Sequence, residues 1–247
     1  MSVASDFTSV LSLDWGINFI QCMPNGLLKY TELCQLMQLT AARHSELGGI
    51  SFTDMQVHHQ AWVLSRMRVE IHQLPRWKDQ VTIKTWINSL ENSRSIRAME
   101  IWVNNEKYVG AETFWAVFNT QTRRPEALVL SHEHYEKFAD WRATQKSFDK
   151  VMPVAEAPVL YQHKVALSDL DIVNHVNHVK YLEWCLDVLP KEILLEQKIK
   201  AFDMNFIKEL YWGDEIMVRG SIENHPLKMS IHREDSAVFS LALEPDF

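Results

Sequence analysis

Apolar and polar side chains alternate along most of this chain, the pattern of β-strands that bury one face. In the first half the alternating stretches are residues 14–22, 62–71, 81–87, 96–103 and 111–119. In the second half they are residues 159–167, 202–207, 215–222, 227–232 and 238–243. Two segments have helical spacing instead, residues 28–47 before Gly48 and Gly49, and residues 177–189 before Pro190. The order strand, helix, several strands occurs twice and predicts an α+β fold.

Two matched pairs of segments indicate an internal repeat. Residues 29–34 share Lys-Tyr-x-Glu-x-Cys with residues 180–185, an offset of 151. Residues 76–83 share Trp-x-Asp and an apolar alternation with residues 211–218, an offset of 135. Because both pairs occur in the same order, we predict two homologous units, residues 1–150 and 151–247, each a long helix wrapped by an antiparallel sheet. The polar segment 125–153, most of which lies in the first of these ranges, is predicted to be a helical connector.

Composition narrows the class of protein. The chain has 247 residues, of which 47% are hydrophobic, enough for one large domain or two small ones. No apolar run approaches the roughly 18 residues of a membrane helix. The first residues carry no Lys or Arg, which argues against a secretory signal and favours a cytoplasmic location. Cys22, Cys34 and Cys185 lack CxxC spacing, so we expect buried, reduced thiols.

Charge is distributed unevenly. Residues 1–150 contain 16 Lys+Arg and 16 Asp+Glu, whereas residues 151–247 contain 9 and 16. This balance argues against nucleic-acid binding, which normally requires a basic stripe. An acidic protein partner would have to dock on the first half. The basic residues available for such docking are Arg66, Arg68, Arg76, Lys78, Arg94, Arg97, Arg123 and Arg124. The alternative is a solvated, self-paired surface.

Several long blocks resemble the plant and bacterial acyl-acyl carrier protein (acyl-ACP) thioesterase family. They are PNGLLKY (24–30), AWVLSRMRVEIHQLPRWKDQVTIKTW (61–86), the TRRP turn (122–125), DLDIVNHVNHVKYLEW (169–184) and FIKELYWGDEI (206–216). The resemblance implies two tandem hot-dog units and hydrolysis of acyl-ACP to free fatty acid and holo-ACP. It implies ACP as the protein partner and no metal or organic cofactor, and it allows a homodimer.

The resemblance also implies a catalytic group in the second unit. Asp171 and His175 match the Asp and His of the family's Asp-x-Asn-x-His run, and Glu209 matches its downstream Glu. The family Asn is replaced by Val173, with Asn174 displaced by one position. In an extended stretch Asn174 would face away from Asp171 and His175, which puts the normal mechanism in doubt. Leu210 stands where plant members have a Cys, which removes a cysteine nucleophile there.

Thioester hydrolysis needs an activated water and a stabilised oxyanion, whereas a thiol with a pKa near 8.5 leaves readily. We predict Glu209 as general base, Asp171 as the group that orients His175 or shares the water, and His175 as an oxyanion donor. Asn177 is predicted to cap the second helix, whose first N–H groups are further donors. A metal site at His175 and His178 is the weaker reading, because no second His/Glu cluster has matching spacing.

Two alternatives to acyl-ACP hydrolysis stay open. The same fold could act on acyl-CoA, which would favour a basic nucleotide pocket over protein docking. It could also bind acyl groups without catalysis, because Val173 replaces the family Asn. The resemblance places the acyl chain in the first unit beside its helix, but no spacing reveals the preferred chain length.

Overall fold

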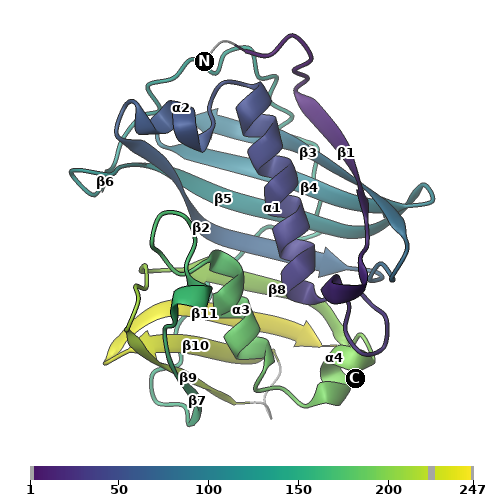
Figure 1. The fold of residues 1–247 in the computed structure, drawn as a ribbon, viewed down its shortest axis with the longest axis vertical. Helices are drawn as coiled ribbons and strands as arrows, with labels where there is room; N and C mark the ends of the chain where they lie inside the picture. Colours follow the sequence, from purple (N-terminus) through teal and green to yellow (C-terminus); the bar gives the residue numbers. More distant parts are fainter. Residues whose placement is uncertain (1–2, 222–225, 246–247) are drawn as a thin grey trace.

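A computed structural model describes residues 3–221 and 226–245, and it shows one long antiparallel sheet with helices on one face (Figure 1). The strands are β1 Val10–Gly16, β2 Gln60–Ile71, β3 Gln80–Glu91, β4 Arg94–Val103, β5 Glu106–Asn119, β6 Arg124–Pro125, β7 Val159–Lys164, β8 Ile199–Phe206, β9 Glu215–Ser221, β10 Leu227–Arg233 and β11 Ser236–Pro245. The helices are α1 Tyr30–Leu47, α2 Phe52–Gln56, α3 His178–Leu186 and α4 Lys191–Leu195. The predicted α+β fold of two tandem hot-dog units is confirmed.

The strand order shows how the two units join. It runs β1-β3-β4-β5-β2-β8-β11-β10-β9-β7, so each unit repeats the same order outward from a central β2–β8 pair. The two central strands are antiparallel, with Arg66 opposite Asn205 and Glu70 opposite Ala201. Because β2 and β8 would each be an open edge in a separate unit, their pairing satisfies backbone groups that would otherwise need another partner.

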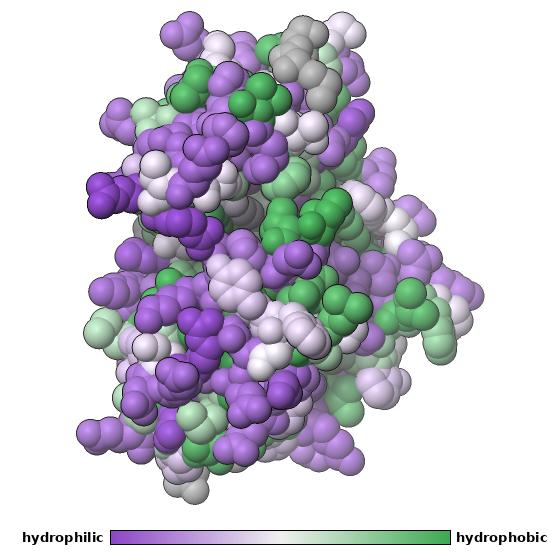
Figure 2. All heavy atoms as spheres, turned by 60° about the vertical axis from the view of Figure 1, so that its left-hand side comes forward, coloured by the Kyte–Doolittle hydropathy of each residue, from purple (hydrophilic) through white to green (hydrophobic). Residues whose placement is uncertain are grey.

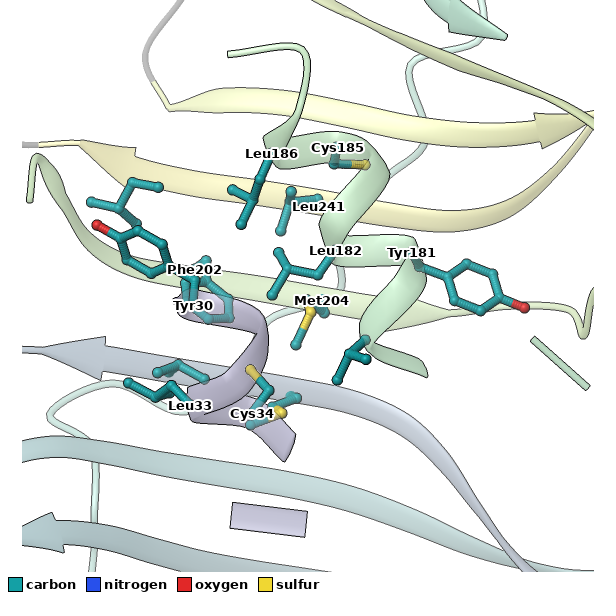
Figure 3. Close-up of a cluster of buried hydrophobic side chains, with 14 of the residues drawn as sticks. Tyr30, Leu33, Cys34, Tyr181, Leu182, Cys185, Leu186, Phe202, Met204 and Leu241 are labelled. Carbon is teal, nitrogen blue, oxygen red and sulfur yellow. The ribbon is translucent and has the colours of Figure 1, made fainter. Parts of the chain in front are cut away.

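The main core lies between the sheet and the two long helices and is shared by both units. Figure 3 shows Leu33 and Cys34 of α1, Leu182 of α3, and Met204 of β8 in one buried cluster. The helix ends follow their sequence signals: α1 ends at Leu47 with Gly48 as its C-cap, and α3 is followed by a turn and Pro190. No helix among the described residues is long and apolar enough to cross a membrane.

A buried ionic cluster crosses the junction on the sheet face opposite the helices. Arg68 of β2, whose side chain is only 2% exposed, donates to Glu70 at 2.8 Å, to Asp203 of β8 at 2.6 Å and to Glu244 of β11 at 3.0 Å. Backbone N–H groups of the connector, at Gln145 and Lys146, also donate to Glu70. Each carboxylate is therefore paired, as a buried charge requires.

A second buried polar cluster fixes the end of α1. His44 is fully buried and its Nε2 lies 2.9 Å from the Thr8 carbonyl oxygen, while Arg97 donates to Nδ1 at 2.8 Å. Arginine can only donate, so Nδ1 is the acceptor and the imidazole is neutral. Burial, together with the Arg97 charge, lowers the pKa of His44 to about 3.

The sequence predictions were wrong about where the first strand of each unit ends and about the connector. The expected strand at residues 14–22 is β1 followed by a 3-10 turn at Phe19–Gln21, and the expected strand at residues 159–167 ends at Lys164. The end of the strand expected at residues 215–222 lies outside the described residues. The segment 126–158 contains no helix, because its carbonyls bond to the sheet: Asn88 donates to the carbonyls of Phe138 and Trp141. The patterns did not predict the short helices α2 and α4.

The offset of the repeat also needs correction. Lys29 and Asn177, which directly precede the two long helices, lie 148 positions apart. The contact of Gln21 with Glu32 in the first unit corresponds to the contact of Asp169 with Lys180 in the second, and both residues of this pair are also shifted by 148 positions. The Lys-Tyr-x-Glu-x-Cys match, at 151, is therefore about one helical turn out of register. The offset of 135 holds, because Asp79 and Asp214 each accept from the backbone N–H three residues earlier.

The ionic cluster predicts a large effect of Arg68→Ala on stability. Removing the cation leaves three carboxylates without their shared partner at a buried junction, so the free energy of unfolding should fall by about 3–5 kcal/mol. Urea denaturation measures this. Arg66→Ala, on the same strand but only half-buried, is the control and should cost less than half as much; equal losses would contradict the role assigned to the cluster.

The His44 cluster predicts acid sensitivity. His44 is neutral in the folded state down to a pKa of about 3, whereas an unfolded histidine titrates near pH 6.5. The unfolded state therefore binds one more proton between these values, and the free energy of unfolding should fall as the pH drops from about 6.5 toward 3. His44→Gln should flatten this slope in denaturation measured at several pH values, whereas exposed His58→Gln should not. An unchanged slope in His44→Gln would refute the assignment.

Candidate active site

The strand order brings two distant loops together at one end of the central pair. β5 and β8 both run antiparallel to β2 and flank it on either side. Asn119, at the end of β5, lies opposite Gln60, and β8 ends in the same direction. The turn after β5 and the loop after β8 therefore meet over the start of β2. Arg123 lies in the first of these loops and Glu209 in the second.

The segment 170–177 forms a closed loop in front of α3. Leu170 and Val176 form an antiparallel bridge, and Asp171 N–H donates to the His175 carbonyl at 2.8 Å. Asp171 Oδ1 accepts from the N–H groups of Val173 at 3.0 Å and His175 at 3.3 Å. The Asp171 carboxylate thus fixes the backbone that presents His175.

The start of α3 confirms one predicted role and corrects the geometry of another residue. Asn177 caps α3, its side chain accepting from Val179 N–H at 3.2 Å. Asn174 is not in an extended stretch as predicted, since it has φ 63° in the left-handed region that Asn tolerates. The loop leaves Ile172 95% exposed and Val173 40% exposed, so the side chain at the family Asn position lies at the surface.

The structure places His175 and Glu209 beside one another. His175 Nδ1 lies 3.5 Å from Glu209 Oε1, and both side chains are about a quarter exposed. Tyr211 packs edge-on against the imidazole, with ring centroids 5.0 Å apart. The loops are tied by Val176 N–H, which donates to the Leu210 carbonyl at 2.9 Å. A half-buried imidazole and carboxylate in this geometry can share a proton or a water molecule.

The other oxygen of Glu209 is held by two donors that our site prediction missed. Arg123 Nη2 and the Tyr211 hydroxyl both donate to Oε2, the latter at 3.0 Å. Glu209 raises the pKa of Arg123 through this hydrogen bond and its charge. Burial, followed by the hydrogen bond to Glu209, raises the pKa of Tyr211. The TRRP turn was a sequence signal for Arg123, but nothing in its local pattern connects it with Glu209.

Asp171 is not brought into contact with Glu209. Its hydrogen bonds in the described part of the chain stay within its own loop. Asp169 is structural too, since Oδ2 accepts from Ala166 N–H and lies 2.8 Å from His163 Nε2. The structure thus joins His175 and Glu209 directly and links Asp171 to them only through the backbone of His175.

The first unit contains a loop with the same backbone hydrogen bonds but without ionisable side chains at the equivalent positions. Met23 N–H donates to the Leu27 carbonyl as Asp171 N–H does to that of His175, and Leu28 N–H donates to Pro75 as Val176 N–H does to Leu210. The residues of the first unit that correspond to Asp171, His175, Glu209 and Val173 are Met23, Leu27, Leu74 and Asn25. The equivalent position in the first unit thus has no acid, base or imidazole.

The other histidine and cysteine side chains considered from the sequence differ in burial and in pKa. No group of three or more His, Cys, Asp or Glu side chains with metal-binding geometry occurs among residues 3–221 and 226–245. Burial lowers the pKa of His178 to about 4, so this imidazole stays neutral near pH 7. Cys34 and Cys185 are fully buried and burial raises the pKa of the Cys34 thiol to about 12, whereas Cys22 is only half-buried.

Several large apolar side chains close to the site residues in sequence are exposed. Leu167, Ile172, Val173 and Trp212 are exposed beside His175 in sequence or in the loop after Glu209. The side of the molecule that carries β6 comes forward in Figure 2, where hydrophobic patches lie among polar residues. The predicted basic docking set needs correction, because Arg68 and Arg97 are buried inside the protein.

Comparison with known proteins gives a consistent match. The model of the acyl-ACP thioesterase N-terminal domain matches residues 9–135, and that of the C-terminal domain matches residues 155–239. Oleoyl-acyl carrier protein thioesterase 1 of Arabidopsis thaliana is 28% identical over 207 residues, which cover 74% of this chain and 56% of that protein. A palmitoyl-acyl carrier protein thioesterase of Cuphea hookeriana is 25% identical over 190 residues, 70% of this chain and 45% of that protein. The chain spans about half the length of these plant relatives.

Solved structures show the same fold over nearly the whole chain. An acyl-ACP thioesterase from Bacteroides thetaiotaomicron superposes with a TM-score of 0.88 at 21% identity, covering 96% of this chain and 98% of that one. The 12:0-ACP thioesterase from Umbellularia californica superposes with a TM-score of 0.81 at 20% identity, covering 97% and 98%. At these identities the superpositions establish the fold alone.

Proposed function

This chain belongs to the acyl-ACP thioesterase family, and we propose that it hydrolyses acyl-ACP to a free fatty acid and holo-ACP. The observation that carries the proposal is the approach of His175 Nδ1 to Glu209 Oε1, 3.5 Å apart. The same loop in the first unit has Leu27 and Leu74 at these two positions. A single site in the second unit, open to the surface, is therefore the proposed centre of the reaction.

In the proposed reaction Glu209 is the general base. It takes a proton from a water molecule as the water oxygen attacks the thioester carbonyl, and the carbonyl becomes an oxyanion. The C–S bond then breaks, and the phosphopantetheine thiolate leaves and receives the proton from Glu209. No covalent intermediate with the protein is required, in agreement with Leu210 at the position of the plant Cys.

Oxyanion stabilisation is assigned to His175 and to the start of α3. A ring N–H of His175 is one proposed donor. The backbone N–H of His178, the first residue of α3, has no hydrogen-bond acceptor among the described residues, whereas the neighbouring N–H groups of Asn177 and Val179 are bonded. Unpaired donors at a helix N-terminus favour a developing negative charge. Asp171 is proposed to orient His175 through the loop backbone.

The acyl chain is proposed to lie in the first unit beside α1. Support comes from the buried methionines that gather between the sheet and the helices: Met37, Met67, Met99 and Met204. Methionine side chains are unbranched and adaptable, so they can rearrange around a flexible alkyl chain more easily than branched residues can.

A thiol-release assay tests the proposal. Purified protein should release thiol from acyl-ACP in a series of chain lengths, and faster than from the matching acyl-CoA. Glu209→Gln should lower kcat about 10²- to 10⁴-fold by removing the base. Asp171→Ala should also lower it, and Asp171→Asn should retain more activity because an amide oxygen can still accept from the loop N–H groups.

Glu215→Gln is the control, because Glu215 is an exposed carboxylate near the site in sequence and pairs only weakly with Lys164. Absence of thiol release at every chain length would reject the enzymatic proposal in favour of acyl binding alone. A higher rate with acyl-CoA would reassign the substrate. Wild-type rates in both Glu209→Gln and Asp171→Ala would reject the residue assignment.

Val173→Asn should leave activity unchanged or raise it. Loss of one oxyanion donor costs on the order of 10²- to 10³-fold, so restoring an amide could recover part of that factor. Asn fits the loop, because Asn25 at the equivalent position accepts from Leu27 N–H at 3.0 Å. The assay is kcat for Val173→Asn beside Val173→Ala, which removes bulk without adding an amide. A large loss in Val173→Asn alone would show that the site has adapted to Val173.

A further inference from the structure

Arg123 connects the first unit to the proposed base of the second. Its guanidinium pairs with Glu209 Oε2, although the two residues are 86 positions apart and belong to different units. The Tyr211 hydroxyl donates to the same oxygen at 3.0 Å. Two donors therefore hold Oε2, and Oε1 is left facing His175 Nδ1.

Hydrogen bonds within the turn that carries Arg123 hold its backbone in one conformation. Asn119 Oδ1 accepts from the N–H groups of Gln121 and Thr122, each at 2.9 Å, and the Asn119 carbonyl accepts from Arg123 N–H at 2.9 Å. Arg123 itself has φ 58°, a left-handed conformation that disfavours residues with a Cβ. The β5–β6 pairing of Asn119 with Arg124 closes the turn. Such conformations persist where surrounding structure enforces them, and they concentrate at functional sites.

We propose that Arg123 is a positioning residue for thioester hydrolysis: it holds the Glu209 carboxylate in the orientation that the reaction needs. This inference rests on the proposed function of Glu209. A carboxylate on a flexible side chain would otherwise sample several rotamers, and small misplacements of a reacting group are costly. The active site is then complete only when the first unit supplies Arg123.

The groups around Glu209 leave Arg123 as its direct cationic partner. His175 and Tyr211 face the carboxylate, and the buried Tyr181 hydroxyl interacts with it electrostatically. Arg233, whose charge acts on Tyr211, is paired with Asp214 at 2.7 Å. Without Arg123, Oε2 would keep the Tyr211 hydroxyl as the donor that holds it.

A double-mutant cycle with acyl-ACP as substrate tests this role. Arg123→Gln should lower kcat roughly 10- to 100-fold with a smaller change in KM. Arg123→Lys keeps the positive charge but loses the planar guanidinium group, so its kcat should lie between those of wild type and Arg123→Gln. In a Glu209→Gln background, Arg123→Gln should have little further effect, because it acts through Glu209.

Arg124→Gln is the matched control, since Arg124 is exposed in the same turn and makes no ion pair in the described part of the chain. It should leave kcat and KM unchanged. If Arg123 instead contacts ACP or the phosphate of its prosthetic group, Arg123→Gln will raise KM and its effect will add to that of Glu209→Gln, which overturns the positioning role.

Thermal denaturation of wild type, Arg123→Gln, Glu209→Gln and the double variant tests the inference separately from the proposed function. If the change in Tm of the double variant differs from the sum of the two single changes, the Arg123–Glu209 contact is supported. Additive changes in Tm overturn it. If wild-type protein releases no thiol at any chain length, the proposed function fails, whereas the Tm cycle still decides whether Arg123 positions Glu209.

Discussion

The pairing of β2 with β8 is the constraint on which the rest of the molecule depends. It converts two small sheets, each with an open edge, into one continuous sheet and lets both long helices share a core. The Arg68 cluster covers the same junction on the other face, where Glu70, Asp203 and Glu244 come from three strands and both units. The register of this pair is thereby defined by buried charges as well as by backbone hydrogen bonds.

The register of the central strand pair decides where the candidate active site lies. β5 and β8 flank β2 and end on the same side, so the turn after β5 and the loop after β8 must meet. Arg123 and Glu209 become neighbours through this topology, and the closed loop before α3 adds His175. The two units keep the same loop hydrogen bonds, but Met23, Leu27 and Leu74 make the first copy apolar. The proposed site therefore draws on both units, with Arg123 from the first and with His175 and Glu209 from the second.

Asp171 and Val173 show how a loop can keep its shape when one of its polar side chains is lost. In the first unit Asn25 accepts from Leu27 N–H, and in the second unit the equivalent N–H of His175 donates to Asp171. The Asp171 carboxylate thus takes over a hydrogen bond that an amide makes in the other copy. Val173 is left at the surface, next in sequence to the almost fully exposed Ile172.

Sequence alone determined the elements and the positions of the candidate residues. Alternation and helical spacing located the two long helices and most strands, and the matched blocks pointed to Asp171, His175 and Glu209. These signals are local, because each depends on side chains a few positions apart. The coil conformation of the connector, the burial of Arg68 and Arg97, and the contact of Arg123 with Glu209 were decided by tertiary structure alone. Each depends on partners dozens of positions away, whose distance is set by strand order and register.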